Sequence, residues 1–478
     1  MSFTTASFLF FFLPITIVLF LFVSFLEEKF DLIKRKELKK YFLVIASILF
    51  YSFAGIYDVI SLMIYSMVTF ACGTLLIKSK KNKKLLCFIV PVVLLIPLIY
   101  SKYFLFVFNL IGTIFKLEVT EPHIFTFVGI SFITFSALSY IFDIYYEKVD
   151  EEKNKFLDFL LYITFFPKII SGPIVKWRDF NLSTEKRNLR DDFIVGINKI
   201  SIGIFKKVLI ADTLGNVVVS IGKQGLNIDI VTAWGCTFLY FLQIYYDFAG
   251  YSDIAIGLLK ILGFDCDENF NFPYKSTSIS EFWRRWHISL GSWFREYIYI
   301  PLGGNRAGEK RTLINLFIVF LVTGIWHGAG FGYLIWGISH GLCVIFERTQ
   351  RDKLWYKKMP KFLKWIGTMF IVMLGWQFFR YGDIMDTFYF FKSLFVSNHN
   401  FIDYTYKYFF DRKTVVIALI GFVFSVFGER SLNSLKKEID ENRLIPFILI
   451  ETSVIIILVF SLISMVSSTV SPFIYFQY

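Results

Sequence analysis

Apolar segments long enough to cross a lipid bilayer recur from one end of this chain to the other. The first, Ser7 to Leu26, contains no charged side chain, and a helix of about 20 apolar residues spans the roughly 30 Å hydrocarbon core of a membrane. Inside that core every backbone N–H and C=O must be paired within the protein, which confines such segments to helices or a closed barrel. The repetition of these runs predicts an all-α, polytopic integral membrane protein, placed in the cytoplasmic membrane as a multi-pass protein.

The composition agrees with this class and argues against a soluble protein. Hydrophobic residues make up 56% of the chain and charged residues only 18%, whereas about a quarter of the residues of a typical soluble domain are charged. No segment outside the apolar runs is large enough to fold alone, and the sequence shows no internal repeat. We therefore expect a single membrane-embedded domain, residues 1–478, whose function lies among the spans.

The apolar segments predict about eleven or twelve transmembrane crossings. Residues 41–77 must cross twice, turning near Ala54 to Asp58, and Leu85 to Phe115 is long enough for one tilted span or a broken pair. The remaining expected spans are 125–146, 156–172, 193–221, 231–262, 312–327, 332–347, 363–380, 414–428 and 445–469.

The basic residues, which give a net charge of +12, are concentrated in short loops between spans. Two clusters, Lys34–Lys40 and Lys78–Lys84, are typical of cytoplasmic loops and suit contact with lipid headgroups. We therefore expect membrane lipids, and no nucleic acid, as their partners. Five scattered cysteines without a C-x-x-C pair, and five histidines without an H-E-x-x-H motif, predict no disulfide framework and no metal site.

An unusually polar stretch, Ser280 to Arg306, lies between apolar segments. Ser278 and Glu281 have the S-x-x-E spacing of a helix-starting capping box. An aromatic stripe then recurs at steps of three or four residues: Trp283, Trp286, Leu290, Trp293 and Tyr297. This periodicity predicts one amphipathic helix that ends at Ile300 to Gly304, and it suits an interfacial helix as well as a protein-lined cavity. His287 falls beside the stripe rather than among the charges.

A second stretch, Thr323 to Gly341, places two histidines in apolar surroundings. His327 ends an apolar run, and three glycines within the next five residues predict a break in the helix. An ionisable side chain at membrane depth indicates a functional site, and the glycines leave room for a substrate to approach. His340 is expected to be a hydrogen-bonded partner between helices. Asp247 and Asp253 are likewise expected to satisfy neighbouring helices.

Together these stretches resemble the membrane-bound O-acyltransferase family, in particular its bacterial branch of alginate and peptidoglycan O-acetylation proteins. The family pattern "WRRWH…W.R.Y.Y.PLGG.R" is similar to Trp283 through Arg306, and the "G.WHG" block to Gly324 through Gly328. Further segments in the same order, such as "YYDFAGYSDIAIG" (Tyr245 to Gly257), extend the resemblance over residues 40–345. It implies acyltransferase activity, and transmembrane helices with amphipathic or re-entrant helices around a central tunnel.

The resemblance also implies roles for individual residues. His327 is the expected catalytic base, and His287 is expected to orient the thioester or the acceptor, since neutral imidazole with a pKa of roughly 6.5 suits proton transfer near neutrality. The expected substrate-binding residues are Trp283, Arg284, Arg285, Trp286 and Trp326. The two arginines fit the side where donor phosphates arrive. The implied donor is an acyl-CoA or acyl-carrier-protein thioester, and no tightly bound cofactor and no metal are expected.

The last eight residues, "SPFIYFQY" (471–478), are similar to a C-terminal "FIY" motif of this branch and of the partner protein in teichoic-acid D-alanylation. Tyr475 matches the tyrosine that is proposed to carry the acyl group as an ester in those systems. The resemblance therefore makes Tyr475 an expected catalytic acceptor. An aromatic belt after the last span is the other interpretation of these residues.

The implied function is O-acetylation of an extracytoplasmic cell-envelope polysaccharide or peptidoglycan, with the acyl group taken from a cytosolic thioester. An extracytoplasmic SGNH-type acetyltransferase is the implied partner. D-alanyl transfer of the teichoic-acid type is the alternative. A transporter is a third reading, which paired discontinuous spans in an internal repeat would favour.

Overall fold

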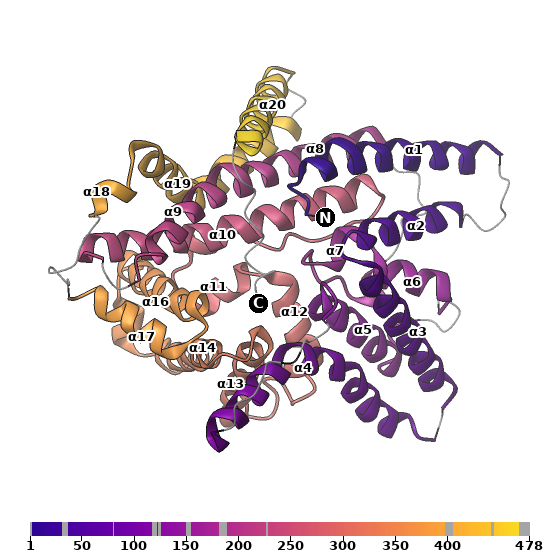
Figure 1. Ribbon diagram of the computed structural model, residues 1–478, viewed down its shortest axis with the longest axis horizontal. Helices are drawn as coiled ribbons and strands as arrows, with labels where there is room; N and C mark the ends of the chain where they lie inside the picture. Colours follow the sequence, from indigo (N-terminus) through magenta and orange to yellow (C-terminus); the bar gives the residue numbers. More distant parts are fainter. Residues whose placement is uncertain are drawn as a thin grey trace. The chain divides into compact units, whose positions relative to one another are not determined.

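The structure is a computed structural model, shown in Figure 1. It describes residues 2–30, 37–79, 81–116, 122, 126–149, 154–180, 189–225, 228–396, 405–440 and 444–467. These residues form helices and connecting loops, and none of them forms a strand, so the expected all-α fold is confirmed. The chain divides into two compact units, residues 1–200 with 254–267 and residues 201–253 with 268–478.

The first unit is built from the amino-terminal helices. They are η1 (Phe8–Phe12), α1 (Leu13–Phe30), α2 (Leu38–Ser52), α3 (Ile56–Lys78), α4 (Lys83–Phe115), α5 (Ile130–Tyr145), α6 (Phe156–Thr164), α7 (Phe166–Ile169), η3 (Trp177–Asp179) and most of α8 (Leu189–Ile204). Helix α5 packs against α3, α4 and α6 and is buried on nearly every side, as expected of a helix that is apolar all round. Gly73 of α3 permits this packing, because a Cβ there would lie 2.3 Å from the ring of Tyr140.

The second unit contains the sequence motifs. Its helices are η4 (Phe205–Asp212), α9 (Thr213–Gly222), most of α10 (Ile230–Ile261), η5 (Pro273–Lys275), α11 (Ile279–Arg285), α12 (Ile288–Phe294), η6 (Arg295–Tyr299), α13 (Glu309–His327), α14 (Phe331–Gln350), α15 (Leu354–Lys358), α16 (Lys361–Tyr381), α17 (Ile384–Ser393), α18 (Tyr406–Phe409), α19 (Arg412–Asp440) and α20 (Leu444–Ser467).

Helices α13 and α14 form a closely packed hairpin. A Cβ on Gly324 would lie 2.7 Å from the carbonyl oxygen of Tyr333, and one on Gly337 would lie 2.6 Å from that of Phe320. Small residues therefore let the two backbones touch, as is common between membrane helices. Helix α14 also packs against α16 and α11, and these four helices together position the histidines.

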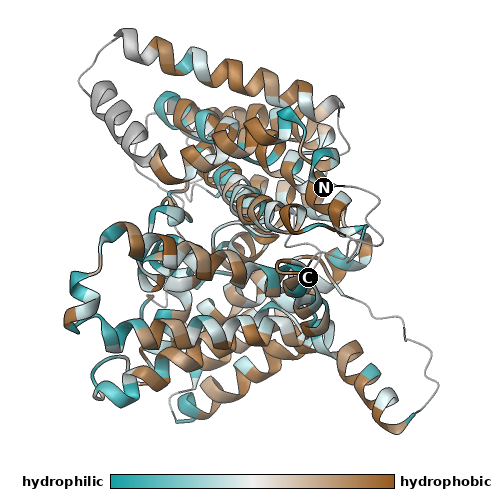
Figure 2. Ribbon diagram, turned by 90° about the vertical axis from the view of Figure 1, so that its left-hand side faces the viewer, coloured by the Kyte–Doolittle hydropathy of each residue, from teal (hydrophilic) through white to brown (hydrophobic). Residues whose placement is uncertain are grey.

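Five helices in the described residues are long and apolar enough to cross a membrane: Phe8–Glu27, Ile56–Lys78, Lys83–Phe115, Lys361–Tyr381 and Ile448–Met465. Figure 2 shows hydrophobic residues recurring along the coloured helices, with polar residues among them. Many of them face outward, among them Phe88 and Ile463, which is the arrangement that lipid contact requires. The expected number of eleven or twelve crossings stays a prediction.

Most expected spans coincide with helices to within a few residues. Residues 85–115 lie within one continuous helix despite two internal prolines, which decides between the two alternatives for that segment. Residues 156–172, expected to be one span, are instead broken at Phe165 between α6 and α7. The reason is Pro167, which lies in the first turn of α7, where proline starts a helix and ends the one before it.

Candidate functional site

The predicted amphipathic helix is interrupted at His287. Helix α11 begins as expected, because the Ser278 hydroxyl accepts a hydrogen bond from the Glu281 backbone N–H at 3.0 Å, but it ends at Arg285. His287 then adopts a left-handed backbone conformation, φ 45° and ψ 56°, before α12 starts at Ile288. The prediction of one uninterrupted helix was therefore wrong.

A distant loop segment causes this interruption. The backbone N–H of Ile288 donates to the carbonyl oxygen of Asn269 at 2.9 Å, and the N–H of Asn271 donates to the carbonyl oxygen of Arg285 at 2.9 Å. These two bonds replace helical bonds on either side of His287. The chain accepts the left-handed conformation there, which histidine and asparagine adopt more readily than most residues.

The side chain of Asn269 fixes the protonation of the His287 ring. Its Oδ1 accepts hydrogen bonds from the Ser289 backbone N–H at 3.2 Å and from the Ser289 hydroxyl at 3.0 Å, so this atom is the amide oxygen. The same oxygen lies 3.2 Å from His287 Nδ1. Since an oxygen can only accept, Nδ1 must carry the proton, and in the neutral ring Nε2 is left with a free lone pair.

The surroundings keep His287 neutral. The residue is 3% exposed, and its ring packs edge-on against Phe248 with the ring centres 4.6 Å apart. Burial lowers the pKa of His287 to about 3, since the charged form loses its water. Nε2 is buried and has no hydrogen-bond partner among the described residues. His287 therefore presents an unprotonated nitrogen that can accept a hydrogen bond from an incoming hydroxyl group.

His287 lines a cavity of about 490 Å³ in the second unit. The predicted substrate-binding residues Trp283, Arg284 and Trp286 line the same cavity, and α13 contributes Thr323 to its wall. Arg284 is exposed, as is Arg295, a further arginine of the lining that the sequence did not single out. A cavity of this size, with an apolar wall and few polar groups, is typical of a small-molecule site.

Arg285 is engaged elsewhere. Its Nε donates to Glu281 at 3.0 Å and its Nη1 to the carbonyl oxygen of Asn271 at 3.0 Å. It is not part of the cavity lining. In this structure Arg285 ties α11 to the loop that shapes His287, and its predicted contact with substrate stays a prediction.

His327 is the last residue of α13, directly before the predicted break at Gly328. It is buried together with the adjacent Trp326. Its ring lies between Trp336 and Phe379, with ring centres 5.0 and 4.9 Å away. Because 3.6 residues make one turn, His327 stands about one turn beyond the cavity-lining Thr323 on the same helix.

Tryptophans connect the surroundings of the two histidines. Trp336 contacts His327, and it also contacts Trp283 of the cavity wall at a ring-centre distance of 5.5 Å. His340 lies against both Trp283 and Trp336, at 5.2 and 5.4 Å. The motif residues of α11, α13 and α14 are thus brought into one aromatic cluster, which Trp376 of α16 completes by packing on Trp286 at 4.7 Å.

This cluster holds several buried polar atoms without a partner among the described residues. They are both ring nitrogens of His340 and the indole nitrogens of Trp283, Trp336 and Trp376. Each such group left unpaired costs about 1–3 kcal/mol, and the total approaches the roughly 5–15 kcal/mol net stability of a protein. Buried polar atoms are normally paired with protein or water, so the cluster is suited to a polar ligand or to ordered water. His340 thereby departs from its expected role as a satisfied partner between helices.

The buried charges near the site are paired with each other, as expected. Asp253 accepts from Lys206 at 2.6 Å, and Asp247 forms an ion pair with Lys207, which also donates to Asp212 at 2.8 Å. These carboxylates hold helices together and are not free for chemistry.

Among the residues of the site that the sequence prediction missed are Asn269, Arg295, Trp336 and Trp376. Trp336 lies inside the second motif stretch and could have been named. Asn269 is one polar residue in a loop, and no local pattern marks it. Tyr475 and residues 471–478 lie outside the described residues.

Comparison with known proteins finds relatives that align with most of this chain. The sequence model of the membrane-bound O-acyltransferase family, MBOAT, matches residues 45–381. The chain is 37% identical over 391 residues to the probable alginate O-acetylase AlgI of Pseudomonas putida, covering 80% of this chain and 77% of that protein. It is 33% identical over 413 residues to the peptidoglycan O-acetyltransferase of Helicobacter pylori, covering 79% and 76%. It is 27% identical over 355 residues to the teichoic acid D-alanyltransferase of Bacillus subtilis, covering 68% and 84%.

Proposed function

The chain belongs to the membrane-bound O-acyltransferase family, and from this premise we propose that it acetylates hydroxyl groups of a cell-envelope polysaccharide or peptidoglycan outside the cytoplasmic membrane. It is an acyltransferase and a multi-pass membrane protein. In the proposal, the acetyl group comes from a cytosolic thioester and passes through the membrane to the outer side.

The observation that carries the proposal is the unprotonated Nε2 of His287, which is buried and has no partner among the described residues. Because Asn269 holds the Nδ1–H, Nε2 can only accept a hydrogen bond. A hydroxyl acceptor supplies the proton for that hydrogen bond. The cavity of about 490 Å³ on which His287 lies offers room for the acetyl thioester end of a donor.

In the proposed reaction His287 and His327 have different tasks. On binding, the acceptor hydroxyl donates its one proton in a hydrogen bond to His287 Nε2, which holds the hydroxyl oxygen toward the thioester carbonyl carbon. As the new C–O bond forms and the C–S bond breaks, the hydroxyl turns this proton to His327, which takes it and returns it to the leaving thiolate. The products are an ester and a free thiol. Exclusion of bulk water by the surrounding tryptophans protects the thioester from hydrolysis.

The donor and the exit route complete the proposal. Arg284 and Arg295, exposed at the cavity, suit the phosphates of coenzyme A or of a carrier protein's phosphopantetheine, since arginine binds phosphate in a bidentate manner. Tyr475 is the proposed first acceptor, and a secreted SGNH-type acetyltransferase the proposed partner that moves the group from Tyr475 to the polymer.

D-alanyl transfer to teichoic acid is less well supported. The acetylation relatives are 33–37% identical and cover 79–80% of the chain, whereas the D-alanyltransferase of B. subtilis is 27% identical over 68% of it. Both reactions would use the same histidines, so the acyl group itself must be identified by experiment.

The test is acyl transfer by purified protein in sealed proteoliposomes. Acetyl-CoA, an acetylated carrier protein and a D-alanyl carrier protein are supplied on one side, and ester formation on Tyr475 is followed by mass spectrometry of the C-terminal peptide. We expect an acetyl increment, and its loss by more than tenfold in His327→Ala, because the base is removed. Lys310→Gln, at the exposed start of the same helix α13, is the matched control and should react normally.

Two results would contradict the proposal. Transfer of D-alanine but not acetyl would assign the alternative reaction. Normal acetylation in His327→Ala would remove that residue as the base.

A further inference from the structure

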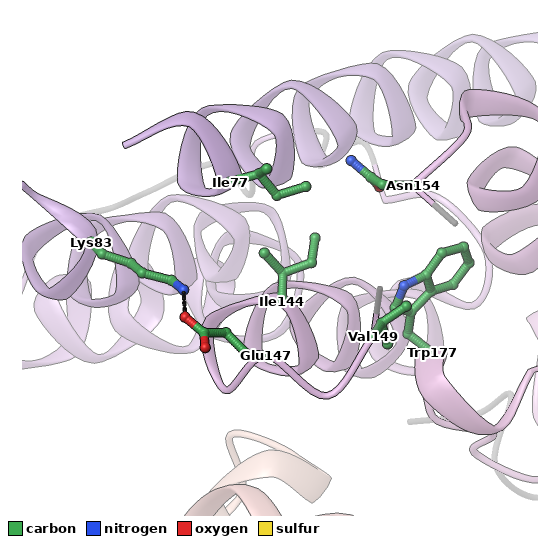
Figure 3. A pocket seen from close by; sticks show the side chains of 7 residues that line it. All are labelled: Ile77, Lys83, Ile144, Glu147, Val149, Asn154 and Trp177. Carbon is green, nitrogen blue, oxygen red and sulfur yellow. Dashed lines mark hydrogen bonds and ion pairs between the residues drawn. The ribbon is translucent and has the colours of Figure 1, made fainter. Parts of the chain in front are cut away.

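The first unit contains a second cavity, which the proposed reaction does not use. It measures about 300 Å³ and is lined by Ile77, Lys83, Ile144, Glu147, Val149, Asn154 and Trp177 (Figure 3). Small-molecule pockets begin at roughly this size. The cavity lies where α3 ends at Lys78, α4 begins at Lys83 and α5 ends at Tyr145.

The position of the cavity corresponds to a membrane surface. Helices α3 and α4 are two of the five apolar helices long enough to span a bilayer, and the cavity adjoins the ends of both. The basic segment Lys78–Lys84 runs from the end of α3 into the start of α4, and basic segments between spans lie at the level of lipid headgroups on the cytoplasmic side. Leu85, Phe88 and Ile89 follow on α4 and are exposed apolar side chains, so they are placed for contact with lipid chains.

The walls of the cavity offer groups of opposite charge. Lys83 Nζ and Glu147 Oε1 pair at 2.6 Å on one side of the cavity, and Asn154 and Trp177 lie on the other side (Figure 3). The Glu147 side chain is 81% exposed and that of Lys83 27% exposed. An exposed pair of this kind contributes little to stability, so a ligand that satisfies both charges can replace it at small cost.

Trp177 is the second, independent indication of a ligand. It is 5% exposed, and its indole N–H has no hydrogen-bond partner among the described residues. Figure 3 shows the indole nitrogen on the side of the ring that faces the other lining residues. The Asn154 carbonyl oxygen accepts the Tyr140 hydroxyl at 2.7 Å, which leaves the Asn154 amide N–H groups as donors. A buried N–H without a partner costs about 1–3 kcal/mol, and an acceptor in the cavity would remove that cost.

We propose that this cavity binds the headgroup of a zwitterionic phospholipid that carries a primary ammonium group. The phosphate diester accepts hydrogen bonds from Lys83 and the Trp177 indole, and Asn154 donates to the same phosphate. The lipid ammonium group binds Glu147, taking the place of Lys83. The acyl chains lie along the exposed apolar side chains that follow Lys83 on α4.

The carboxylate distinguishes this ligand from other phosphates. A free phosphate or an anionic lipid would draw Lys83 away from Glu147 and would bring no cation of its own to replace it. A headgroup with a quaternary ammonium cannot donate a hydrogen bond to the Glu147 oxygen. A phosphoethanolamine headgroup has both the acceptor and the donor that the cavity requires.

Binding can be measured by native mass spectrometry of the delipidated full-length protein. The probes are phosphatidylethanolamine, phosphatidylcholine and phosphatidylglycerol with identical acyl chains, together with soluble O-phosphoethanolamine. We expect phosphatidylethanolamine to bind at least fivefold more tightly than the other two lipids. Lys83→Gln and Trp177→Phe should each weaken its binding at least fivefold. Lys84→Gln, which changes the same charge at an exposed neighbour outside the cavity, should change it less than twofold.

Glu147→Gln tests the ammonium contact without disturbing the fold, since this side chain is mostly exposed. It should abolish the preference over phosphatidylglycerol while leaving phosphatidylglycerol binding intact or stronger. Thermal unfolding adds a second readout for Trp177→Phe. Without lipid the midpoint should stay level or rise, because an unpaired N–H is removed, and the increase that phosphatidylethanolamine gives to the wild type should disappear.

Several outcomes would overturn the proposal. Equal binding of the three lipids by the wild type would show no headgroup recognition. Unchanged selectivity in Glu147→Gln would place the lipid elsewhere. Binding of O-phosphoethanolamine as tight as that of the lipid would identify a site for a soluble phosphate compound instead. None of these measurements depends on acyl transfer, so the result is independent of the proposed function.

Discussion

Replacing His287 with asparagine should stop acyl transfer while leaving the protein almost as stable as the wild type. The substitution removes Nε2, the buried nitrogen that has no partner among the described residues, and keeps a donor near the position of Nδ1. The new amide can still donate to Asn269 Oδ1, the partner that lies 3.2 Å from Nδ1 in the wild type. Asparagine also tolerates the left-handed conformation at φ 45°.

The magnitudes follow from these contacts. Alanine at this position would lose the hydrogen bond, about 0.5–1.5 kcal/mol, and would meet a left-handed penalty of roughly 1–2 kcal/mol. His287→Ala should therefore destabilise the protein by about 2–3 kcal/mol, and His287→Asn by less than about 1 kcal/mol. Loss of the group that positions the reacting oxygen costs roughly 10²-fold in rate when that oxygen moves by about 1 Å. Asparagine thus separates the chemical effect from the structural one.

The assay is the initial rate of Tyr475 acetylation in proteoliposomes at saturating donor, combined with thermal unfolding of the same preparations. His287→Gln is a useful third variant, because its longer side chain brings an amide oxygen toward the position of Nε2 and should recover part of the rate. His327→Ala should be slower than His287→Asn, because it removes the base itself. The reasoning is refuted if His287→Asn keeps more than one-tenth of the wild-type rate, or if it unfolds as early as His287→Ala.

Three further predictions concern the tail, the pH dependence and the unpartnered histidine. Tyr475→Phe should abolish transfer with unchanged expression, because only the acceptor oxygen is removed; full envelope acetylation in that variant would favour the aromatic belt. The pKa of His287 falls from roughly 6.5 in the unfolded chain to about 3 in the folded protein because of burial, so the unfolded chain alone takes up a proton as the pH drops below 6.5. The free energy of unfolding is therefore unaffected by this group above pH 6.5 and decreases toward pH 3 by about 1.4 kcal/mol per pH unit. At pH 5 the wild type should have lost about 2 kcal/mol more stability than His287→Asn. Parallel pH curves of the unfolding midpoint for the two proteins would contradict this. His340→Leu should unfold no earlier than the wild type, because neither ring nitrogen has a partner among the described residues, and a midpoint several degrees lower would reveal a bond that the structure does not describe.

The sequence was sufficient wherever structure depends on neighbouring residues. The cap at Ser278 and the end of α13 at His327 were both predicted correctly, because a capping serine and a run of glycines act within one helical turn. The break at His287 was not predicted. It depends on Asn269, which lies 18 residues earlier in the chain. The aromatic periodicity gives no sign of the break, because it continues unchanged through His287.

The same distinction applies to the site. Trp283, Arg284, Trp286 and His287 could be named from a motif, and the structure places them on one cavity. The protonation of His287 could not be inferred, because it follows from which atom of the Asn269 amide faces the ring. The motif also treats Arg284 and Arg285 alike, although successive residues on a helix point about 100° apart and only Arg284 reaches the cavity.

The ion pairs of Lys206 and Lys207 also bear on how the chain enters the membrane during synthesis. These lysines belong to η4, and their partners Asp253 and Asp247 belong to α10, which emerges from the ribosome later. Lys207 already pairs with Asp212 of its own segment, so Lys206, Asp247 and Asp253 are the charges that lack these partners when the helices are inserted singly. At about 2.5–3.5 kcal/mol for a charge at the centre of a helix, the three cost roughly 8–11 kcal/mol together. Inserted side by side, the helices supply a partner for each of them. We therefore expect the segment that contains η4 to stay at the translocon until α10 arrives, so that the two helices enter the bilayer as one unit.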